Sequence, residues 1–372
     1  MSVKAINPNG TSTYYDRLGP IGVLVADDEV SEVMVMGTRE IYVELHGKIV
    51  LTDARFKDED QLMDVIRFIV GSVGRRIDEE NPLCDARLPT GARVHAVIPP
   101  VAVDGPMLTI RKFARDLLQA DDLTALGSCS PAGFAFLEAC VMARANILIS
   151  GGASTGKTTL LNIVSGYADD DERIVTIEDA AELQLRQRHV ARLEARPPGS
   201  ERGREISIRD LVVTSLRMRP DRIVIGEVRG PEALDMLQAM NTGHYGSMTT
   251  IHANKPRDAL NRIETLVMMA GFDLPARAIR AQIASGINIV AHLERLRDGT
   301  RKLTRISEIT GMEDDVIQMQ DVFAFNAEGT DPYGRVTGAF TLSHIRPRIL
   351  ERFHDLGLAM PPVLARLFPS GA

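Results

Sequence analysis

The sequence predicts an α/β protein in which a phosphate-loop domain follows a smaller domain of mixed α and β structure. From about residue 145 onward, short apolar runs with strand character alternate with helical segments, a pattern typical of a mostly parallel sheet. Before that point, short strands separated by turn-forming pairs accompany a single amphipathic helix. The two patterns differ enough to indicate two separate folding units.

The N-terminal domain is expected over residues 1–114. Strand patterns fall at residues 33–36, 41–45, 49–51, 94–98 and 107–110. Apolar residues recur at helical spacing over 62–73, and Asp58 is suited to cap that helix. A polar stretch over 115–130, rich in Asp, Gly and Ser, is expected to be the interdomain linker.

The second domain is expected over residues 131–310. Its apolar strand runs fall at 147–149, 174–177, 223–225 and 248–251. In a parallel sheet, ligands bind beyond the carboxyl ends of the strands, and we expect every motif below at that edge. Residues 311–372 are expected to form a C-terminal appendage, whose role the chemistry of its residues does not indicate.

The composition is that of an ordinary folded chain. Of the 372 residues, 44% are hydrophobic and 25% are charged, which indicates neither disorder nor a fibrous repeat. The formal net charge of −7 gives no overall attraction to nucleic acid, so no nucleic-acid partner is expected. Three cysteines without a CxxC pair suit a reducing compartment, and no apolar run is long enough for membrane insertion. We therefore expect a cytoplasmic protein.

Residues 151–158, Gly-Gly-Ala-Ser-Thr-Gly-Lys-Thr, fit the Walker A pattern between a predicted strand and a predicted helix. Such a loop points consecutive backbone N–H groups at phosphate, and Lys157 reaches the terminal phosphates. The alternative is a glycine-rich turn that matches by chance. We expect ATP and Mg²⁺ as ligands, with Thr158 offering a hydroxyl to the metal. The residues expected to bind the nucleotide are Gly152, Ala153, Ser154, Thr155, Gly156, Lys157, Thr158 and Thr159.

Carboxylates and histidines follow or flank the other strands. Glu178 and Asp179 end one strand, and Glu227 follows another. ATP hydrolysis needs one group to hold Mg²⁺, partly through water, and another to orient the attacking water. The sequence leaves open which carboxylate does which, and each could simply be a solvated loop residue. His244 and His252 flank a further strand, where a histidine could contact a γ-phosphate or be merely structural.

The ordered set of motifs is more specific than any one of them. GGASTGKTT, TIEDAAELQL, SLRMRPDRIVIGEVRGPEALDMLQAMNTGH and GSMTTIHANKPRDALNRIETLV follow one another in the chain. This set resembles the secretion ATPases of type II, type IV pilus and type IV secretion systems. Within that superfamily, ARLPTGARVHAVIPP, GPMLTIRKF and HVARLEARPP are most similar to the CpaF branch, which drives tight-adherence (Tad) pili.

The resemblance implies a fold and a set of roles. It implies a RecA-like ATPase domain after a PAS-like N-terminal domain, assembled as a homo-hexameric ring. It assigns Glu178 to an acidic box, Glu227 to an atypical Walker B motif that holds the metal, and His244 and His252 to a histidine box. Arg93 and Arg111 match N-terminal arginines that approach phosphate, and Arg87 is a weaker match. Three softer candidates for phosphate or interface contacts are Asp179, Arg217 and Arg219.

The function implied is a motor that powers assembly, and possibly retraction, of a Tad or type IV-like pilus. Its partners would be platform proteins of the bacterial inner membrane, at whose cytoplasmic side it would work. Two alternatives remain open: a nucleotide-gated regulatory module with little turnover, and a conjugation-type secretion or DNA-translocation ATPase.

One loop position departs from the pattern of the CpaF branch, which commonly reads GGTGSGKTT. Here Ser154 stands in place of glycine. If this position needs a positive φ, serine costs on the order of 1 kcal/mol relative to glycine. We then expect altered turnover without loss of ATP binding.

Overall fold

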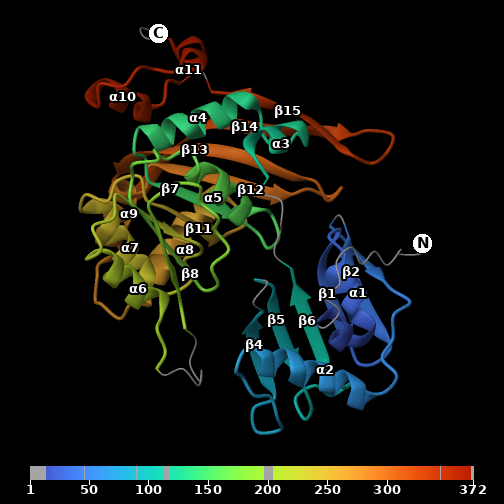
Figure 1. The fold of residues 1–372 in the computed structure, drawn as a ribbon. Coiled ribbons are helices and arrows are strands. Elements are labelled where there is room, and N and C mark those ends of the chain that lie inside the picture. Colours follow the sequence, from blue (N-terminus) through green and yellow to red (C-terminus); the bar gives the residue numbers. More distant parts are fainter. Residues whose placement is uncertain are drawn as a thin grey trace. The chain divides into compact units, whose positions relative to one another are not determined.

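The computed structural model describes residues 14–45, 47–88, 91–112, 118–196, 204–343 and 345–369 (Figure 1). Most of them fall into two compact units, one made of residues 14–112 and the other of residues 118–196 with 205–369. Each unit contains helices and strands, which confirms the predicted α/β class. The two units are described separately below.

The first unit is a six-stranded antiparallel sheet with strand order β3-β2-β1-β6-β5-β4. Its elements are η1 (Tyr15–Ile21), α1 (Gly22–Ala26), β1 (Val30–Met36), β2 (Glu40–Leu45), β3 (Lys48–Leu51), α2 (Glu59–Ser72), β4 (Leu83–Arg87), β5 (Arg93–Val97) and β6 (Met107–Arg111). The side chain of Asp58 accepts a hydrogen bond from the Gln61 backbone at 2.9 Å, so the predicted cap of α2 is confirmed. The apolar face of α2 is buried against this sheet, in a core with Val33 and Ile110.

The second unit is built on a nine-stranded sheet with the order β15-β14-β13-β12-β7-β11-β10-β8-β9. Its strands are β7 (Ile147–Gly151), β8 (Ile174–Glu178), β9 (Val190–Glu194), β10 (Arg222–Ile225), β11 (Met248–His252), β12 (Ile289–Arg295), β13 (Arg301–Glu313), β14 (Val316–Thr330) and β15 (Val336–Leu342). In this order, every pair of neighbouring strands between β12 and β9 is parallel. The three remaining pairs, β12 with β13, β13 with β14 and β14 with β15, are antiparallel. All four strands predicted from the apolar runs lie in the parallel part.

Helices cover both faces of this sheet (Figure 1). The helices of the second unit are α3 (Ala120–Ala125), α4 (Pro131–Met142), α5 (Lys157–Ser165), α6 (Ile208–Ser215), α7 (Glu232–Asn241), α8 (Pro256–Met268), α9 (Ala276–Gly286), η2 (Arg348–Glu351), α10 (Arg352–Asp355) and α11 (Pro362–Leu367). One core contains residues of α4 and α5, and the core on the opposite face contains residues of α6 to α9. Helices on both faces of a parallel sheet are the usual solution for strands that are apolar on both sides.

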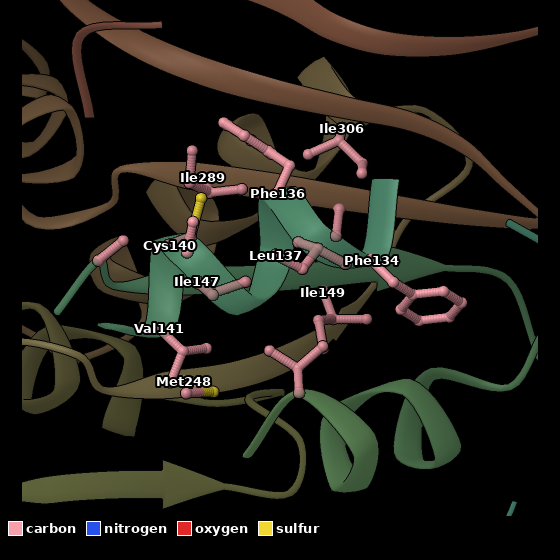
Figure 2. Packing of buried hydrophobic residues seen from close by; sticks show 14 of the residues in the cluster. Phe134, Phe136, Leu137, Cys140, Val141, Ile147, Ile149, Met248, Ile289 and Ile306 are labelled. Carbon is pink, nitrogen blue, oxygen red and sulfur yellow. The ribbon is translucent and has the colours of Figure 1, made fainter. Parts of the chain in front are cut away.

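Helix α4 is buried over most of its length, and Figure 2 shows how its side chains pack between strands and neighbouring helices. Phe136 is fully buried, and its ring centroid lies 5.6 Å from that of Phe323 and 6.3 Å from that of Phe368. Ser130 caps the helix by accepting a hydrogen bond from Gly133 N at 3.1 Å. The contacts of α4 therefore join its core to residues close to the end of the chain.

Two expectations about domain organisation need correction. The described residues between 311 and 369 do not form a separate appendage, because β14 and β15 extend the nine-stranded sheet and Phe368 packs into its core. The stretch over 115–130 is not linker throughout, since residues 120–125 form α3 and Leu123 packs against the same core. Apolar residues after 311 alternate weakly, and their burial depends on partners far away in the sequence.

Candidate functional site

The phosphate loop connects β7 to α5 at the carboxyl edge of the parallel sheet. Its first residue, Gly151, has no room for a side chain, because a Cβ there would lie 2.5 Å from the Leu293 carbonyl oxygen and 2.6 Å from Thr155 Oγ1. Thr155 is buried, and its hydroxyl donates to the Gly152 carbonyl at 3.1 Å. Lys157 donates from Nζ to the same carbonyl at 2.8 Å. The loop is thus held in a tight curl at the start of a helix, as the Walker A pattern predicts.

Two loop residues have left-handed backbone conformations. Gly156 has φ 96°, which glycine adopts at no steric cost, and Ser154 has φ 56°. The φ of Ser154 is therefore positive, which is the case in which we expected a cost relative to glycine. Some backbone strain is expected at this serine. The side chain of Arg301, at the start of β13, lies over Gly156, with its Cδ 3.8 Å from the site of a Cβ. The motifs gave no indication of this arginine.

The carboxylates follow β8 and β10, on the same edge as the loop. Glu178 is the last residue of β8, and Glu227 lies in the turn after β10. That turn is fixed on both sides: Gly226 N donates to the Ile177 carbonyl at 2.8 Å, and Thr250 Oγ1 donates to the Gly226 carbonyl at 2.7 Å. The structure therefore holds Glu227 between β8 and β11. Asp179 forms an ion pair with Arg229, an arrangement that also suits a purely structural role.

Glu178 is the most buried of these carboxylates, at 3% exposure. Its Oε2 accepts hydrogen bonds from the backbone of Glu182 at 2.7 Å and of Leu183 at 2.9 Å, whereas its Oε1 is buried without a partner in the described residues. Burial raises the pKa of this carboxyl, and the two backbone hydrogen bonds oppose that shift. A carboxylate oxygen with unused acceptor capacity and a raised pKa is chemically suited to accept a proton.

The two histidines lie at opposite ends of β11. His252 is the last residue of the strand and pairs in register with Gly151, so it lies beside the phosphate loop. His244 precedes the strand, at the amino edge of the sheet, and its Nδ1 is buried without a partner in the described residues. The expectation that every motif lies at the carboxyl edge is therefore wrong for His244, because the chain crosses the sheet between the two histidines.

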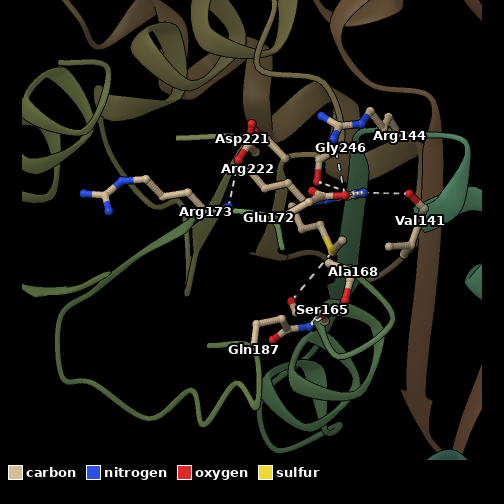
Figure 3. Close-up of polar contacts among 12 residues, drawn as sticks. Val141, Arg144, Ser165, Ala168, Glu172, Arg173, Gln187, Asp221, Arg222 and Gly246 are labelled. Carbon is tan, nitrogen blue, oxygen red and sulfur yellow. Dashed lines mark hydrogen bonds and ion pairs between the residues drawn. The ribbon is translucent and has the colours of Figure 1, made fainter. Parts of the chain in front are cut away.

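Arg217 and Arg219 are exposed and precede β10, so they too lie at the amino edge. The parallel strands separate them from the phosphate loop of their own chain, and their predicted contact with phosphate or with a neighbouring subunit stays a prediction. Between them and the core lies Arg222, whose guanidinium donates to both carboxylate oxygens of Glu172 (Figure 3). Arg144 pairs with the same carboxylate at 3.4 Å. This amino-edge cluster is a fully bonded structural network.

The three predicted arginines of the first unit lie in one row. Arg87 pairs in register with Arg93 across β4 and β5, and Arg93 pairs with Arg111 across β5 and β6. Residues directly opposite one another share a face of the sheet, with Cβ atoms about 5 Å apart. The row continues to Glu32 of β1, which pairs in register with Arg111, so part of its positive charge is balanced within the sheet.

The residues present at the carboxyl edge fit a nucleotide with its metal. Gly152 and Gly156 give a curled backbone before a helix N-terminus, Lys157 provides a cation, and Thr158 provides a hydroxyl in the first turn. Within the described ranges, no three His, Cys, Asp or Glu side chains are arranged to hold a metal by themselves. Mg²⁺ usually keeps several waters and binds through few protein groups together with phosphate.

Comparison with known proteins gives the family. A profile described as type II/IV secretion system protein matches residues 15–345. The chain belongs to the type II/IV secretion system protein family. A putative conjugal transfer protein of Mycobacterium tuberculosis is 38% identical over 302 residues, which cover 79% of this chain and 85% of that protein. The conjugal transfer protein TrbB of Rhizobium radiobacter is 31% identical over 314 residues, covering 82% and 92%.

One further relative is similar in sequence, and two solved structures are similar in fold. The type IV secretion system protein PtlH of Bordetella pertussis is 38% identical over 261 residues, covering 63% of this chain and 76% of that protein. The ATPase DotB of Yersinia pseudotuberculosis has a TM-score of 0.58 at 15% identity, covering 99% and 97%. The pilus retraction motor PilT, solved with bound ADP, has a TM-score of 0.55 at 17% identity, covering 94% and 96%. The predicted placement in the secretion ATPase superfamily is confirmed, and the assignment to the Tad branch stays a prediction.

Two further observations concern the cysteines and the helices. Cys84, Cys129 and Cys140 are all buried free thiols. Within the part of the chain that the structure describes, no helix is long and apolar enough to cross a membrane.

Proposed function

We propose that this chain is an ATP-hydrolysing motor of a type IV secretion machine of the conjugation type. One observation carries the proposal: the phosphate loop, Glu178, Glu227 and His252 come from four strands and meet at one edge of the sheet. An edge with a phosphate cradle, two carboxylates and a histidine provides the groups that phosphoryl transfer to water requires.

Each group has a proposed role. The backbone N–H groups of the loop and Lys157 bind the phosphates. Thr158 and Glu227 hold Mg²⁺, partly through water, and the metal neutralises phosphate charge when bound. Glu178 or Glu227 orients the attacking water, and the Oε1 of Glu178, which has no partner among the described residues, favours that residue. His252, beside Gly151, donates a hydrogen bond toward the terminal phosphate.

The arginine row of the first unit is proposed to supply cations to a bound phosphate. Arg93 and Arg111 are the main candidates, with Arg87 beside them. Guanidinium groups suit this role because each presents several donors in a fixed plane and always stays charged. Arg93→Ala is expected to raise the KM for ATP and lower turnover, whereas Arg217→Ala is expected to do neither in the isolated subunit.

The names of the relatives favour a conjugation-type secretion machine over a pilus. Conjugal transfer proteins match most of this chain, and PtlH is named for a type IV secretion system. The net charge of −7 disfavours direct contact with DNA, but a motor that moves protein components of a secretion machine need not touch DNA. The acidic charge is therefore no argument against a conjugation-type machine.

A Tad or type IV-like pilus motor is the second candidate, supported by the ordered motifs of the CpaF branch and by the fold shared with PilT. Under either candidate we propose a homo-hexameric ring at the cytoplasmic side of the inner membrane, working on membrane-embedded platform proteins. Binding of the purified chain to the cytoplasmic part of a pilus platform protein, but not to a conjugation-type channel protein, would favour the pilus.

The test of hydrolysis is phosphate release by the purified chain with ATP and Mg²⁺. Lys157→Ala and Glu227→Gln are expected to lower turnover by about 100-fold or more, because each removes a group that acts on the transferred phosphate. Glu328→Gln, at an exposed carboxylate of β14, is the matched control and is expected to keep wild-type turnover. Equal phosphate release by all four proteins would contradict the motor.

The same assay separates the motor from a nucleotide-gated regulatory module. Such a module would bind ATP tightly and release no phosphate, even in the presence of its membrane partner. Turnover that the partner stimulates would support the motor instead.

A further inference from the structure

His292 is a buried polar residue at the phosphate edge to which no motif drew attention. It lies on β12, in register with Ser150 of β7, and it is fully buried. Its Nδ1 lies 2.8 Å from Ser150 Oγ, and its Nε2 lies 3.1 Å from the carbonyl oxygen of Asn254. Ser150 directly precedes the phosphate loop, and Asn254 follows His252 by two residues. The ring therefore spans from the strand that carries the loop to the segment that carries the histidine.

The partners fix the proton positions on this ring. A carbonyl oxygen only accepts hydrogen bonds, so Nε2 of His292 carries the hydrogen and donates to Asn254. In a neutral ring Nδ1 is then an acceptor, and the Ser150 hydroxyl donates to it. Burial lowers the pKa of His292, which favours this neutral form, although Glu294, at 3.7 Å from Nε2, opposes the shift. Both ring nitrogens are thus used, and each contacts a different loop.

Backbone contacts reinforce the same connection. Ala253 N donates to the Gly151 carbonyl at 3.2 Å, one residue after His252. Leu293, next to His292, places its carbonyl oxygen against the Cα of Gly151 so closely that no Cβ would fit. A shift of the loop entrance therefore acts on β12 and on the segment 252–254 together, because close-packed groups do not deform independently.

We propose that His292 is a positioning residue that couples occupation of the phosphate loop to the placement of His252. The inference rests on the proposed function, since it gives His252 a task at the terminal phosphate. His292 touches neither nucleotide nor metal in this proposal. It acts through the segment 252–254, which it ties to Ser150.

A purely structural histidine would only stabilise the fold. The test must therefore measure whether nucleotide binding at the phosphate loop changes the segment 252–254. Hydrogen exchange of peptides covering residues 250–256 is measured with and without a non-hydrolysable ATP analogue and Mg²⁺. Binding of the analogue to the phosphate loop is expected to slow exchange in this segment of the wild type. His292→Leu is expected to bind the analogue within about threefold of wild type and to lose this protection.

Three variants serve as companions. His292→Gln keeps one donor and one acceptor, and is expected to retain the protection. Ser150→Ala removes only the bond to Nδ1 and is expected to lose part of the protection, which keeps the test decisive if His292→Leu does not fold. Ser307→Ala is the matched control, because its buried hydroxyl donates to Asp321 Oδ1 at 2.6 Å and, within the described residues, is not bonded to His292, Ser150 or Asn254.

Turnover gives a second, independent readout. His292→Leu is expected to lower kcat by about 10- to 100-fold with little change in KM, as a misplaced reacting group does. In a His252→Ala background the same substitution is expected to have almost no further effect on kcat. Additive losses, or unchanged protection in His292→Leu or in a folded Ser150→Ala variant, would overturn the inference.

The failure of this inference is distinguishable from the failure of the proposed function. A wild-type chain that binds the analogue and shows the coupled protection, yet releases no phosphate, contradicts the motor and leaves the coupling supported. A chain that does not bind the analogue at all overturns both.

Discussion

The two edges of the nine-stranded sheet carry similar polar residues and use them differently. At the amino edge, the buried guanidinium of Arg222 bonds Glu172, the Val141 carbonyl and the Gly246 carbonyl. Nearby, Asn146 uses both its amide nitrogen and its oxygen in hydrogen bonds to backbone groups. At the carboxyl edge, Glu178 keeps one buried oxygen unpaired within the described residues. The network around Arg222 is satisfied, whereas Glu178 retains acceptor capacity, as does the buried Nδ1 of His244 at the amino edge.

This difference separates stability from chemistry. A buried polar group with all its bonds made fixes the fold, because nothing remains for it to bind. A buried group with an unused acceptor is costly to the fold and available to a ligand or a proton. Substitutions in the network around Arg222 should therefore change the free energy of unfolding, and those of the phosphate loop, Glu178 and Glu227 should change binding and turnover.

The largest effect is expected from Arg222→Met. It leaves Glu172 buried with only the partly exposed Arg144 as a cation partner, which should cost about 3–5 kcal/mol of unfolding free energy. ATP affinity of the folded fraction should be unchanged. Denaturant unfolding measures the first quantity and nucleotide titration the second.

Two controls sharpen that result. Arg217→Ala, at an exposed arginine of the same edge, should change the unfolding free energy by no more than about 0.5 kcal/mol. The double variant Glu172→Leu/Arg222→Met should recover part of the lost stability, since no buried charge is left alone. A wild-type unfolding curve for Arg222→Met would remove the distinction between the two edges.

Gly246→Ala tests the same edge by steric means. A Cβ at Gly246 would lie 2.3 Å from Arg222 Nη1, and the residue has φ 84°, so we expect a cost of about 2–3 kcal/mol. Gly243→Ala is the matched control, because its φ is 103° but nothing lies within 4 Å of its Cβ site. The difference between their unfolding free energies isolates the contact with Arg222. Equal losses in both variants would show that the guanidinium moves aside freely.

At the carboxyl edge, Glu178 predicts a dependence of stability on pH. Burial raises the pKa of Glu178 in the folded state above its ordinary 4.5, so the folded state binds this proton more tightly than the unfolded chain does. Ionisation of Glu178 therefore removes stability as pH rises through the raised pKa. Glu178→Gln, which never ionises, should be more stable than wild type at pH 8, and the difference should shrink toward pH 5.

The measurement is the difference in unfolding free energy between the two proteins at each pH, with Glu328→Gln as the control for loss of one charge. Turnover of Glu178→Gln should fall while its stability rises, the opposite of what Arg222→Met does. A stability difference that grows as pH falls would contradict the assigned direction.

Much of the carboxyl edge could be predicted from the sequence, and little of the amino edge. The phosphate loop and the strands before Glu178 and Glu227 follow from local patterns of apolar and glycine residues. The network around Arg222 joins residues 141, 172 and 246, and no local pattern identifies such partners. His292 is likewise a single polar residue in an apolar run, and only the register of β12 with β7 reveals its contacts.

Ser154 should give the smallest effect, and it tests whether the carboxyl edge stores strain. Because Ser154 has φ 56°, Ser154→Gly relieves an unfavourable backbone conformation but also makes the unfolded chain more flexible. Relief of strain stabilises the folded state and the added flexibility stabilises the unfolded state, so the gain in unfolding free energy should not exceed about 1 kcal/mol. Ala153 does not have a positive φ, so Ala153→Gly relieves no strain and only makes the unfolded chain more flexible. This variant should be destabilising. If the two variants shift the unfolding free energy equally, the serine is unstrained, and any change in turnover must come from its hydroxyl.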